Sequence, residues 1–448
     1  MMTPSSQVWS AYLERLRHKD FCRSIGRVTK VSSLVIEASG VRGFIGDLCR
    51  IENPNRRSSD CTAEIIGLRG NITLLMPYGE TKGISLDSEV SALGNSATIN
   101  VGPEFMGRVI DPFGKALDGR PLNATNPVPL RSASHNPLSR QPISEVLETG
   151  VRAIDTFLPL GKGQRVGIFA GSGVGKTTLL GMIARHSKAQ VNVIALIGER
   201  GREVRDFIER TIGPETLSRS IIVVATSDQP ALVRELAAHT ATAIAEYFCA
   251  REMQVLLIMD SVTRFAMAHR EIGLSAGEPA TARGYTPSAF GALPKLLERA
   301  GNFTGKGSIT GIYTVLVEGD DLHEPVSDNM RAILDGHIVL SRDLANHGHY
   351  PAIDLLASIS RLSSELWSKP ENALIRILLR LLSMRERHKD MIEIGAYKAG
   401  SNPEVDRAIA LYPQLEKFLM QEADDIQSRA QQFSELTAIA AEQLGTVH

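Results

Sequence analysis

The sequence is poor in cysteine, in aromatic residues and in long apolar runs. Its four cysteines, Cys22, Cys49, Cys61 and Cys249, form no C-x-x-C pair and have no metal-like spacing to histidine. We therefore expect reduced thiols rather than disulfides or a zinc site. No apolar run approaches the ~20 residues that a membrane-spanning helix needs, and residues 1–20 contain no apolar core of signal-peptide length. These absences predict a cytoplasmic protein.

Net charge is also nearly absent. Lysine and arginine number 49 against 50 aspartates and glutamates, which gives a formal charge of −1. Such a balance provides no overall attraction to nucleic acid or to an anionic membrane, although a local basic patch is compatible with it. A repeat of roughly 20–50 residues, the mark of solenoids and propellers, is missing as well. We expect no nucleic-acid partner.

The composition is that of a globular protein, with 43% hydrophobic and 22% charged residues. A length of 448 residues predicts two or three domains. Residues 1–20 carry apolar side chains at helical spacing, so we expect an amphipathic helix that either packs on its own domain or docks a partner. Residues 21–95 contain short β-rich runs separated by turn residues, which is typical of a small barrel or sandwich.

Residues 96–362 are predicted to form a nucleotide-binding domain. The first part, to about residue 150, is rich in glycine, proline and asparagine and is expected to be a connecting segment on the domain surface. Six apolar runs then alternate with helical stretches: RVGIFA, VNVIALIG, SIIVVATS, VLLIMD, SITGIYTVLV and GHIVLS. Their continuous apolar character predicts strands buried on both faces of a largely parallel sheet. Residues 363–448 show only helix-period patterns and are expected to form a helical domain.

A glycine-rich stretch, AGSGVGKTT, joins the run RVGIFA to the helical LLGMIARHSK. A strand, a glycine-rich turn and a helix in this order form the context of a P-loop. The turn aims backbone N–H groups at phosphate oxygens, and the helix N-terminus adds partial positive charge. Ala170 stands where the strict pattern has glycine, a small residue that such loops tolerate. The nucleotide-binding residues predicted here are Gly171, Ser172, Gly173, Val174, Gly175, Lys176, Thr177 and Thr178.

The P-loop predicts a chemical role for two of its side chains. Lys176 is expected to reach the β- and γ-phosphates of ATP, and the Thr177 hydroxyl to bind Mg²⁺. Asp260, at the end of VLLIMD, has the usual form of the second Mg²⁺-side carboxylate, and open α/β sheets bind ligands at such strand ends. The predicted fold class is an α/β P-loop NTPase core with a parallel sheet, a small N-terminal β-barrel and a C-terminal helical domain.

Cleavage of the nucleotide needs a group that activates water. Glu199 follows the run VNVIALIG, where its carboxylate can orient a water for in-line attack on the γ-phosphorus. Spacing alone leaves a second interpretation open, in which Glu199 only begins a solvated, charged helix. With the P-loop, the sequence predicts a phosphate that is held and then cleaved.

Together these segments resemble the catalytic subunits of rotary ATP synthases. The likeness is carried by LETGVRAIDTFLPLGKGQRVGIFAGSGVGKTTLLGMIAR, VLLIMDSVTRFAMAHREIG and GYTPSAFGALPKLLERAG. Within that superfamily, GERGREV and AILDGHIVLSRDLANHGHYPAIDLLASISR are most similar to the ATPases of type III protein export. The resemblance is strong over about 100–410 and weakest over the first 20 and the last 35 residues.

The resemblance implies roles for individual residues. Arg361 resembles an arginine finger that a neighbouring subunit inserts into the site. Tyr350 and Tyr397 match aromatic positions that enclose the adenine, although ordinary core packing would also explain them. The residues that match catalytic positions of the family are Lys176, Glu199, Arg200, Asp260, Arg264 and Arg361. The family's Mg²⁺ residues correspond to Thr177 and Asp260, partly through water.

The resemblance also implies a biological role. The family's members are ring-forming ATPases, expected here as a hexamer of identical chains, that release export substrates from chaperones and unfold them. The implied partners are a regulatory stator-like protein at the N-terminal helix, a central stalk-like protein, the membrane proteins of the export gate, and the export chaperones and substrates. The implied location is the cytoplasmic face of the bacterial inner membrane.

Several related functions compete with this interpretation. The texture of GHYPAIDLLASISR, IGAYKAGSNP and YPQLEKFL favours the flagellar branch over the injectisome branch. The catalytic subunit of an ATP synthase is a further alternative. A non-catalytic ring subunit is disfavoured because such subunits lack the carboxylate found at Glu199. A hexameric RNA helicase of the termination-factor type is disfavoured by the balanced charge and by the lack of an aromatic and basic face.

Overall fold

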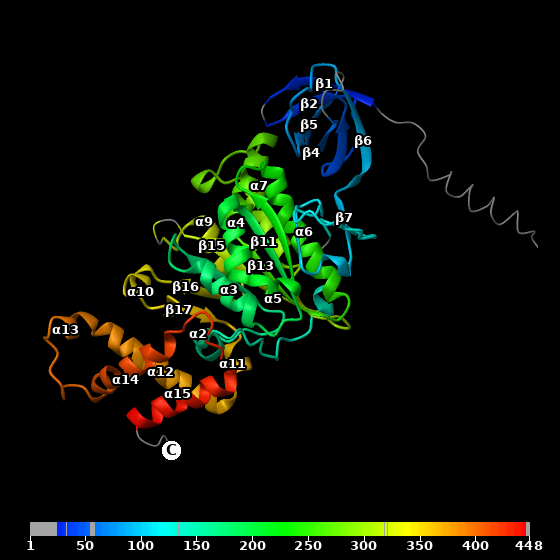
Figure 1. The fold of residues 1–448 in the computed structure, drawn as a ribbon. Coiled ribbons are helices and arrows are strands. Elements are labelled where there is room, and N and C mark those ends of the chain that lie inside the picture. The colour runs from blue at the N-terminus through cyan, green and yellow to red at the C-terminus, as the bar shows by residue number, and fades with distance from the viewer. Residues whose placement is uncertain are drawn as a thin grey trace, which may run out of the picture. The chain divides into compact units, whose positions relative to one another are not determined.

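The computed structural model describes residues 25–32, 34–53, 59–132, 135–317, 319 and 321–444 (Figure 1). The chain divides into two compact units. One contains the residues up to Ala97 together with Ser275–Gly277, and the other contains Thr98–Leu274 and Glu278 onward. The helix predicted for residues 1–20 lies outside the described part of the chain.

The first unit contains a closed barrel of six antiparallel strands in the order β1-β2-β5-β4-β3-β6. Along β1 and β2 every second residue is more deeply buried, the period expected for strands with one face inward. The interior is filled by small and branched side chains such as Val28, Ile36 and Ile65. Of the predicted barrel or sandwich, the structure contains the barrel. Its strands are β1 (Ile25–Val31), β2 (Ile36–Ser39), β3 (Asp47–Ile51), β4 (Cys61–Arg69), β5 (Ile72–Pro77) and β6 (Glu89–Ser96).

The second unit is built on a nine-stranded sheet in the order β17-β16-β10-β15-β13-β11-β12-β8, with β14 (Gly301–Asn302) paired to β15. The six predicted apolar runs all form strands of this sheet, and they pair in parallel. Nearly all of their residues are buried. These strands are β10 (Arg165–Ala170), β11 (Val191–Glu199), β12 (Ser220–Thr226), β13 (Gln254–Asp260), β15 (Ser308–Leu316) and β16 (Gly336–Leu340).

Besides the two-residue β14, two strands of the sheet come from segments where the sequence predicted none. β8 (Arg108–Ile110) belongs to the stretch expected to be a surface connection, but it pairs in parallel with β12. The Arg108 side chain is tolerated there because its guanidinium binds both carboxylate oxygens of Asp118, at 2.6 and 2.7 Å. β17 (Ile353–Ser360) lies at the opposite end of the sheet and pairs antiparallel with β16. β17 therefore runs in the direction opposite to β16 and β10.

The rest of the expected connection contains a two-stranded ribbon, β7 (Thr98–Val101) with β9 (Asn126–Pro129), and leads to the short helix α2 (Arg152–Phe157). The helix α6 (Ala231–Cys249) packs on β11, β12 and β13. None of the helices in the described ranges is long and apolar enough to span a membrane. The remaining helical elements of this part are α3 (Lys176–His186), α4 (Gly201–Asp206), η3 (Phe207–Ile212), α5 (Gly213–Ser218), α7 (Val262–Ala276), α8 (Pro287–Leu297), α9 (Pro325–Ile333), α10 (Arg342–Asn346) and α11 (Ser363–Leu366).

The C-terminal region is helical, as predicted, and belongs to the same compact unit as the sheet. Its first long helix begins at a capping box in which the Ser368 and Glu371 side chains each bind the other's backbone N–H. The long stretch after residue 402 forms two helices rather than one, since a turn follows Leu419. Apolar residues of these helices, including Leu415 and Leu436, share one core with the sheet. The helices are α12 (Lys369–Arg387), α13 (Lys389–Glu393), α14 (Pro403–Leu419) and α15 (Arg429–Leu444).

Candidate active site

Three residues predicted separately from sequence meet at the carboxyl edge of the sheet. β10 ends in the P-loop, β11 ends at Glu199 and β13 ends at Asp260. Because these strands are parallel, their carboxyl ends lie along one side of the sheet. We call this side the carboxyl edge, and the side formed by the amino ends of the same strands the amino edge. The Lys176 ammonium group contacts the Asp260 carboxylate and lies 3.9 Å from a Glu199 oxygen. The structure therefore places one cation between two carboxylates directly beside the P-loop.

The P-loop has the backbone geometry that its glycines predict. Gly173 and Gly175 have φ angles of +78° and +90°, which only glycine adopts without strain. Gly175 is the N-cap of α3, and no side chain caps this helix. The first N–H groups of α3 therefore point outward without a capping side chain, as an anion-binding helix start requires.

A cavity of about 940 Å³ opens over the P-loop. Val174 does not line it, because its side chain is buried in the core beneath. Asp260 is not among the lining residues but lies behind Lys176, where it is 4% exposed and accepts a 2.7 Å hydrogen bond from the Thr314 hydroxyl. The cavity is at the upper end of the range for small-molecule sites and can hold a nucleoside triphosphate. Its lining includes Gly171, Ser172, Gly173, Gly175, Lys176, Thr177, Thr178, Glu199, Arg200, Glu203, Arg264 and Arg342.

The electrostatics of this edge are unbalanced around Glu199. Burial and the neighbouring Asp260 carboxylate raise the pKa of Glu199 to about 7, against the opposing effect of Lys176. The side chain of Glu203 also contacts Glu199 and raises its pKa further. A carboxyl group that titrates near neutral pH is suited to exchange a proton with a bound water.

Three arginines line the cavity, Arg200, Arg264 and Arg342, and the first two were predicted from sequence. The Nε atom of Arg264 is buried and has no hydrogen-bond partner among the described residues. Buried polar atoms are rarely left in this state unless a ligand or water completes them, so Arg264 points to an anionic ligand. Arg200 is exposed at the cavity and forms the N-cap of α4. These positions agree with the phosphate end of a nucleotide.

The oxygen donors around Lys176 fit a magnesium ion. Thr177 is exposed to the cavity, and the Asp260 carboxylate lies beneath it beside Lys176. Magnesium prefers hard oxygen ligands and is usually held by one or two protein oxygens together with substrate phosphates. The donor set at this edge is of that kind.

Arg361 does not lie in this cavity. It directly follows β17, which runs antiparallel to β16, so its backbone reaches the amino edge of the sheet. There its N–H donates to the Asp335 carbonyl at 3.0 Å, and Asp335 binds Arg165 at the beginning of β10. The P-loop begins at the far end of the same strand. At ~3.3 Å per residue the two ends of β10 lie about 16 Å apart.

The two predicted adenine-binding tyrosines lie in different places. Tyr350 is 45% exposed, and its ring stands so close to the P-loop that a Cβ added to Gly175 would lie 3.3 Å from it. Tyr397 lies between α13 and α14 and is not among the residues that line the cavity. Its hydroxyl donates to the Asn402 carbonyl at 3.1 Å and contacts Asp406 at 3.0 Å. The turn after α13 thus keeps Tyr397 on α14, and its predicted adenine contact has no support in the structure.

Sequence reasoning missed two features beside the cavity. The Gln421 N–H donates to the Tyr350 carbonyl at 2.8 Å, which places the turn after α14, including the half-exposed Met420, beside the Tyr350 backbone. Arg342 donates to the Ser172 carbonyl at 3.2 Å. Arg342 begins α10 just past the end of β16, so the rule that ligands bind at the ends of parallel strands could have identified it.

Comparisons with known proteins agree with this geometry. Residues 150–360 match the model of the ATP synthase alpha/beta family, nucleotide-binding domain, and residues 28–94 match its beta-barrel domain. Residues 367–438 match the T3SS EscN ATPase C-terminal domain.

Among curated relatives, the flagellum-specific ATP synthase of Bacillus subtilis is 52% identical over 94% of this chain and 96% of that protein. The SPI-2 type 3 secretion system ATPase of Salmonella typhimurium is 46% identical over 92% of this chain and 95% of that protein. Among solved structures, the assembled ATPase EscN of the enteropathogenic E. coli type III secretion system superposes with a TM-score of 0.88 at 41% identity. That match covers 93% of this chain and 100% of EscN.

Proposed function

This chain belongs to the ATPases of type III protein export, within the ATP synthase alpha/beta superfamily, and from that premise we propose that it powers protein export through a bacterial flagellar apparatus as a ring of identical subunits. The activity itself is ATP hydrolysis. The flagellar assignment, the individual residue roles and the ring are the proposed parts.

A single observation carries the proposal of a shared site. The P-loop and Arg361 lie at opposite edges of the same sheet, so a subunit cannot bring its own Arg361 to its own ATP. The exposed guanidinium is instead presented outward, where a neighbouring subunit can receive it. Since every chain carries both halves, identical subunits complete one another's sites around a ring.

Each group near the P-loop has a defined task in this proposal. Lys176 and the N–H groups at the start of α3 bind the phosphates, and Arg264 contacts the γ-phosphate end. Glu199 holds the attacking water in line and takes up its proton. Arg361 of the neighbouring subunit neutralises the charge that develops on the transferred phosphoryl group. Arg200 stays beside Glu199 as a second cation at the mouth of the cavity.

Thr177 and Asp260 would hold Mg²⁺, which when bound supplies positive charge to the phosphate oxygens. Tyr350 forms a half-exposed wall beside the P-loop, suited to the flat apolar face of a base. We assign the adenine to this wall. Tyr397 takes no part in it.

The oligomer is supported by relatives. EscN was solved as an assembled ATPase, and a further structure shows it with its central stalk EscO. We propose the same arrangement for this chain, a hexameric ring with a stalk-like partner. Residues 1–20 are proposed to dock a regulatory protein, and the ring to work at the inner face of the membrane with the export gate, chaperones and substrates. A chain without residues 1–20 should keep ATP affinity and lose its partner, as measured by co-purification.

The test of the shared site is ATP hydrolysis by the purified chain over a wide range of protein concentrations. Activity per subunit should rise steeply as rings form, because each new interface completes a site. A size measurement at the same concentrations should show assembly over the same range. A rate per subunit that stays constant while assembly changes would refute the shared site.

The flagellar branch can be tested in one organism that has both systems. Salmonella typhimurium has a flagellum-specific ATP synthase that is 50% identical to this chain and a SPI-2 secretion ATPase that is 46% identical. The chain is expressed in two strains, each lacking one of these proteins. We expect motility to be restored and SPI-2 secretion not to be. The opposite pattern would assign the chain to the injectisome branch.

A further inference from the structure

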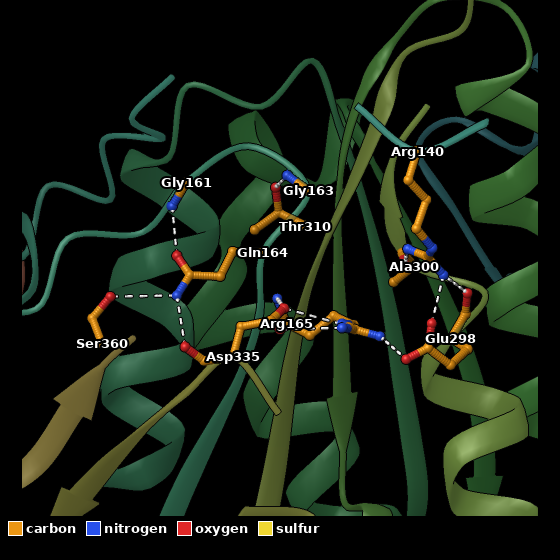
Figure 2. A network of polar contacts seen from close by, with 10 residues as sticks. All are labelled: Arg140, Gly161, Gly163, Gln164, Arg165, Glu298, Ala300, Thr310, Asp335 and Ser360. Atoms are coloured by element: carbon orange, nitrogen blue, oxygen red, sulfur yellow. Dashed lines mark hydrogen bonds and ion pairs between the residues drawn. The ribbon is translucent and has the colours of Figure 1, made fainter. Parts of the chain in front are cut away.

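A network of partly buried charges lies at the start of the P-loop strand (Figure 2) and continues to the backbone of Arg361. Asp335 is at its centre. One Asp335 carboxylate oxygen accepts from both the backbone N–H and the Nε of Arg165, each at 3.0 Å, and the other accepts from Nη2 at 3.1 Å. The Asp335 N–H donates back to the Arg165 carbonyl at 2.9 Å. These two residues are therefore joined by both backbone and side chain.

The Arg165 side of this pair is fixed by further ion pairs. Arg165 also binds the Glu298 carboxylate at the end of α8, and Arg140 binds the same carboxylate at 2.7 Å. Burial opposes the charge on Arg165, but the Asp335 and Glu298 carboxylates hold its pKa above the ordinary value. Charge-assisted, two-pronged contacts of this kind fix geometry better than single bonds do. In Figure 2 they extend from Arg140 to Asp335 across the amino edge of the sheet.

The near side of the pair holds the residues that carry the finger. The Asp335 carbonyl accepts from the Arg361 N–H at 3.0 Å and from the Gln164 side-chain amide at 3.2 Å. The same amide donates to the Ser360 hydroxyl at 3.3 Å, and that hydroxyl donates to the Pro159 carbonyl at 2.9 Å. Gln164 is fully buried.

The finger itself is held loosely at its tip. The Arg361 side chain is exposed, and among the residues that the structure describes it makes one hydrogen bond, from Nη2 to the Arg331 carbonyl in the last turn of α9, at 2.9 Å. A guanidinium group has five N–H donors, so most of its donors are available to a ligand. The chain thus fixes the root of the Arg361 side chain and leaves its end available to a neighbour.

We propose that Arg165 and Asp335, with Gln164, position Arg361 for the neighbouring subunit and tie it to the strand that carries the subunit's own P-loop. This inference rests on the shared site proposed above. Arg165 and Asp335 are positioning residues, since neither reaches a nucleotide in its own cavity. Their substitution should therefore impair the neighbour's site and spare the subunit's own.

The variant that tests this is Asp335→Asn, which keeps the shape and removes the charge. We expect kcat to fall about ten- to hundredfold, because a displacement of about 1 Å in a catalytic group can cost that much. KM and the affinity for an ATP analogue should stay within twofold. Arg165→Lys, which keeps the charge but loses the fork, is the milder variant if Asp335→Asn is unstable. Glu145→Gln removes an exposed ion pair with Lys162 at 2.7 Å, outside this network, and should leave kcat unchanged.

Mixed rings identify which site is damaged. Glu199→Gln subunits lack a working site but lend an intact finger, whereas Arg361→Ala subunits do the reverse. A one-to-one mixture of these two should regain about a quarter of the wild-type rate, because one interface in four combines both intact halves in a randomly mixed ring. This mixture is the control for the shared site, and its failure would remove the premise.

The decisive mixtures contain Asp335→Asn. Mixed with Glu199→Gln it should recover like the control, since the Glu199→Gln subunits supply sound fingers to the intact sites of its partner. Mixed with Arg361→Ala it should not recover. The reverse pattern would mean that Asp335 supports its own P-loop, and recovery in neither mixture would mean that it supports both. Either result, or full activity of the Asp335→Asn variant alone, would overturn the inference while the control still held.

Discussion

The two edges of the central sheet both carry charged residues, but they arrange them differently. At the carboxyl edge, Lys176 faces the carboxylates of Asp260 and Glu199, with Arg264 and Glu203 nearby. Burial, together with the neighbouring Asp260 carboxylate, raises the pKa of Glu199 there to about 7. The groups of this edge are incompletely satisfied in the chain alone.

At the amino edge, every strong charge of the network has a partner. Arg165 is divided between Asp335 and Glu298, and Arg140 completes Glu298. The comparison teaches that unbalanced charge marks the place where a ligand completes the site, whereas balanced charge marks a fixed support. Arg361 lies between these cases, with its backbone in the support and its guanidinium exposed.

The strongest challenge to this comparison is Glu199→Gln. Removing the carboxylate should lower turnover by up to about 10⁴-fold, since a positioned base contributes that much at most. Binding of a fluorescent ATP analogue should be retained, because the phosphates are held by the P-loop. Single-turnover hydrolysis and a binding titration on the same preparation check this. Retained hydrolysis would show that another group positions the water.

Arg361→Ala tests the other edge. In the assembled ring we expect a loss of about 10³-fold in kcat, at the lower end of what arginine fingers contribute. The affinity of the unassembled subunit for ATP should not change, because the side chain lies far from its own cavity. Equilibrium binding at a concentration below assembly measures this. A large loss of affinity in the monomer would contradict the separation of the two edges.

Gly336→Ala tests how rigid the support is. A Cβ at this position would lie 2.7 Å from the Ile359 carbonyl oxygen and 3.2 Å from the Ser360 Cα, both of them backbone atoms of β17. Because backbone cannot move away cheaply, we expect a loss of about 1–3 kcal/mol in the free energy of unfolding. Urea unfolding measures it.

The matched control is Gly291→Ala. Gly291 lies inside α8, and a Cβ there would meet no atom within 4 Å. Alanine favours helix over glycine by up to about 1 kcal/mol, so this variant should be neutral or more stable. Equal losses in both variants would mean that the amino edge is no more tightly packed than an exposed helix.

The smallest expected effect is a pH dependence of stability. The pKa of Glu199 is about 7 in the folded chain against an ordinary value of 4.5, so the folded state holds more protons between these values. Stability from this group is complete below about pH 4.5 and is lost as the pH rises through 7. Without nucleotide, Glu199→Gln should therefore melt a few degrees above wild type at pH 8, and the gap should close towards pH 5. A gap that widened at low pH would contradict this assignment.

Much of the carboxyl edge could be predicted because its signals are local. The P-loop is one continuous stretch, and Glu199 and Asp260 each follow an apolar run. The rule for parallel strands then requires these ends to meet, as they do. The Lys176 contacts with both carboxylates follow from that rule. The raised pKa of Glu199 could not be predicted, because it depends on burial that the sequence does not show.

The amino edge was less predictable. The segment IDLLASIS shows neither that it forms a strand at the end of the sheet nor in which direction that strand runs. The antiparallel direction of β17 depends on how residues 341–352 pack. The three residues of β8 are too few to show a period. The position of Tyr397 could not be predicted for the same reason. It depends on how the turn between α13 and α14 folds rather than on its neighbours in sequence.

The antiparallel direction of β17 affects how many complete sites an assembly of subunits contains. If the two halves of each site are carried on different chains, as proposed above, an open row of subunits contains one complete site fewer than it has members. Closing the row into a circle creates the last site without adding a chain. A subunit that has not yet found a neighbour has none at all, so ATP would be consumed only where assembly has taken place. The direction of one strand would thus restrict ATP hydrolysis to assembled subunits.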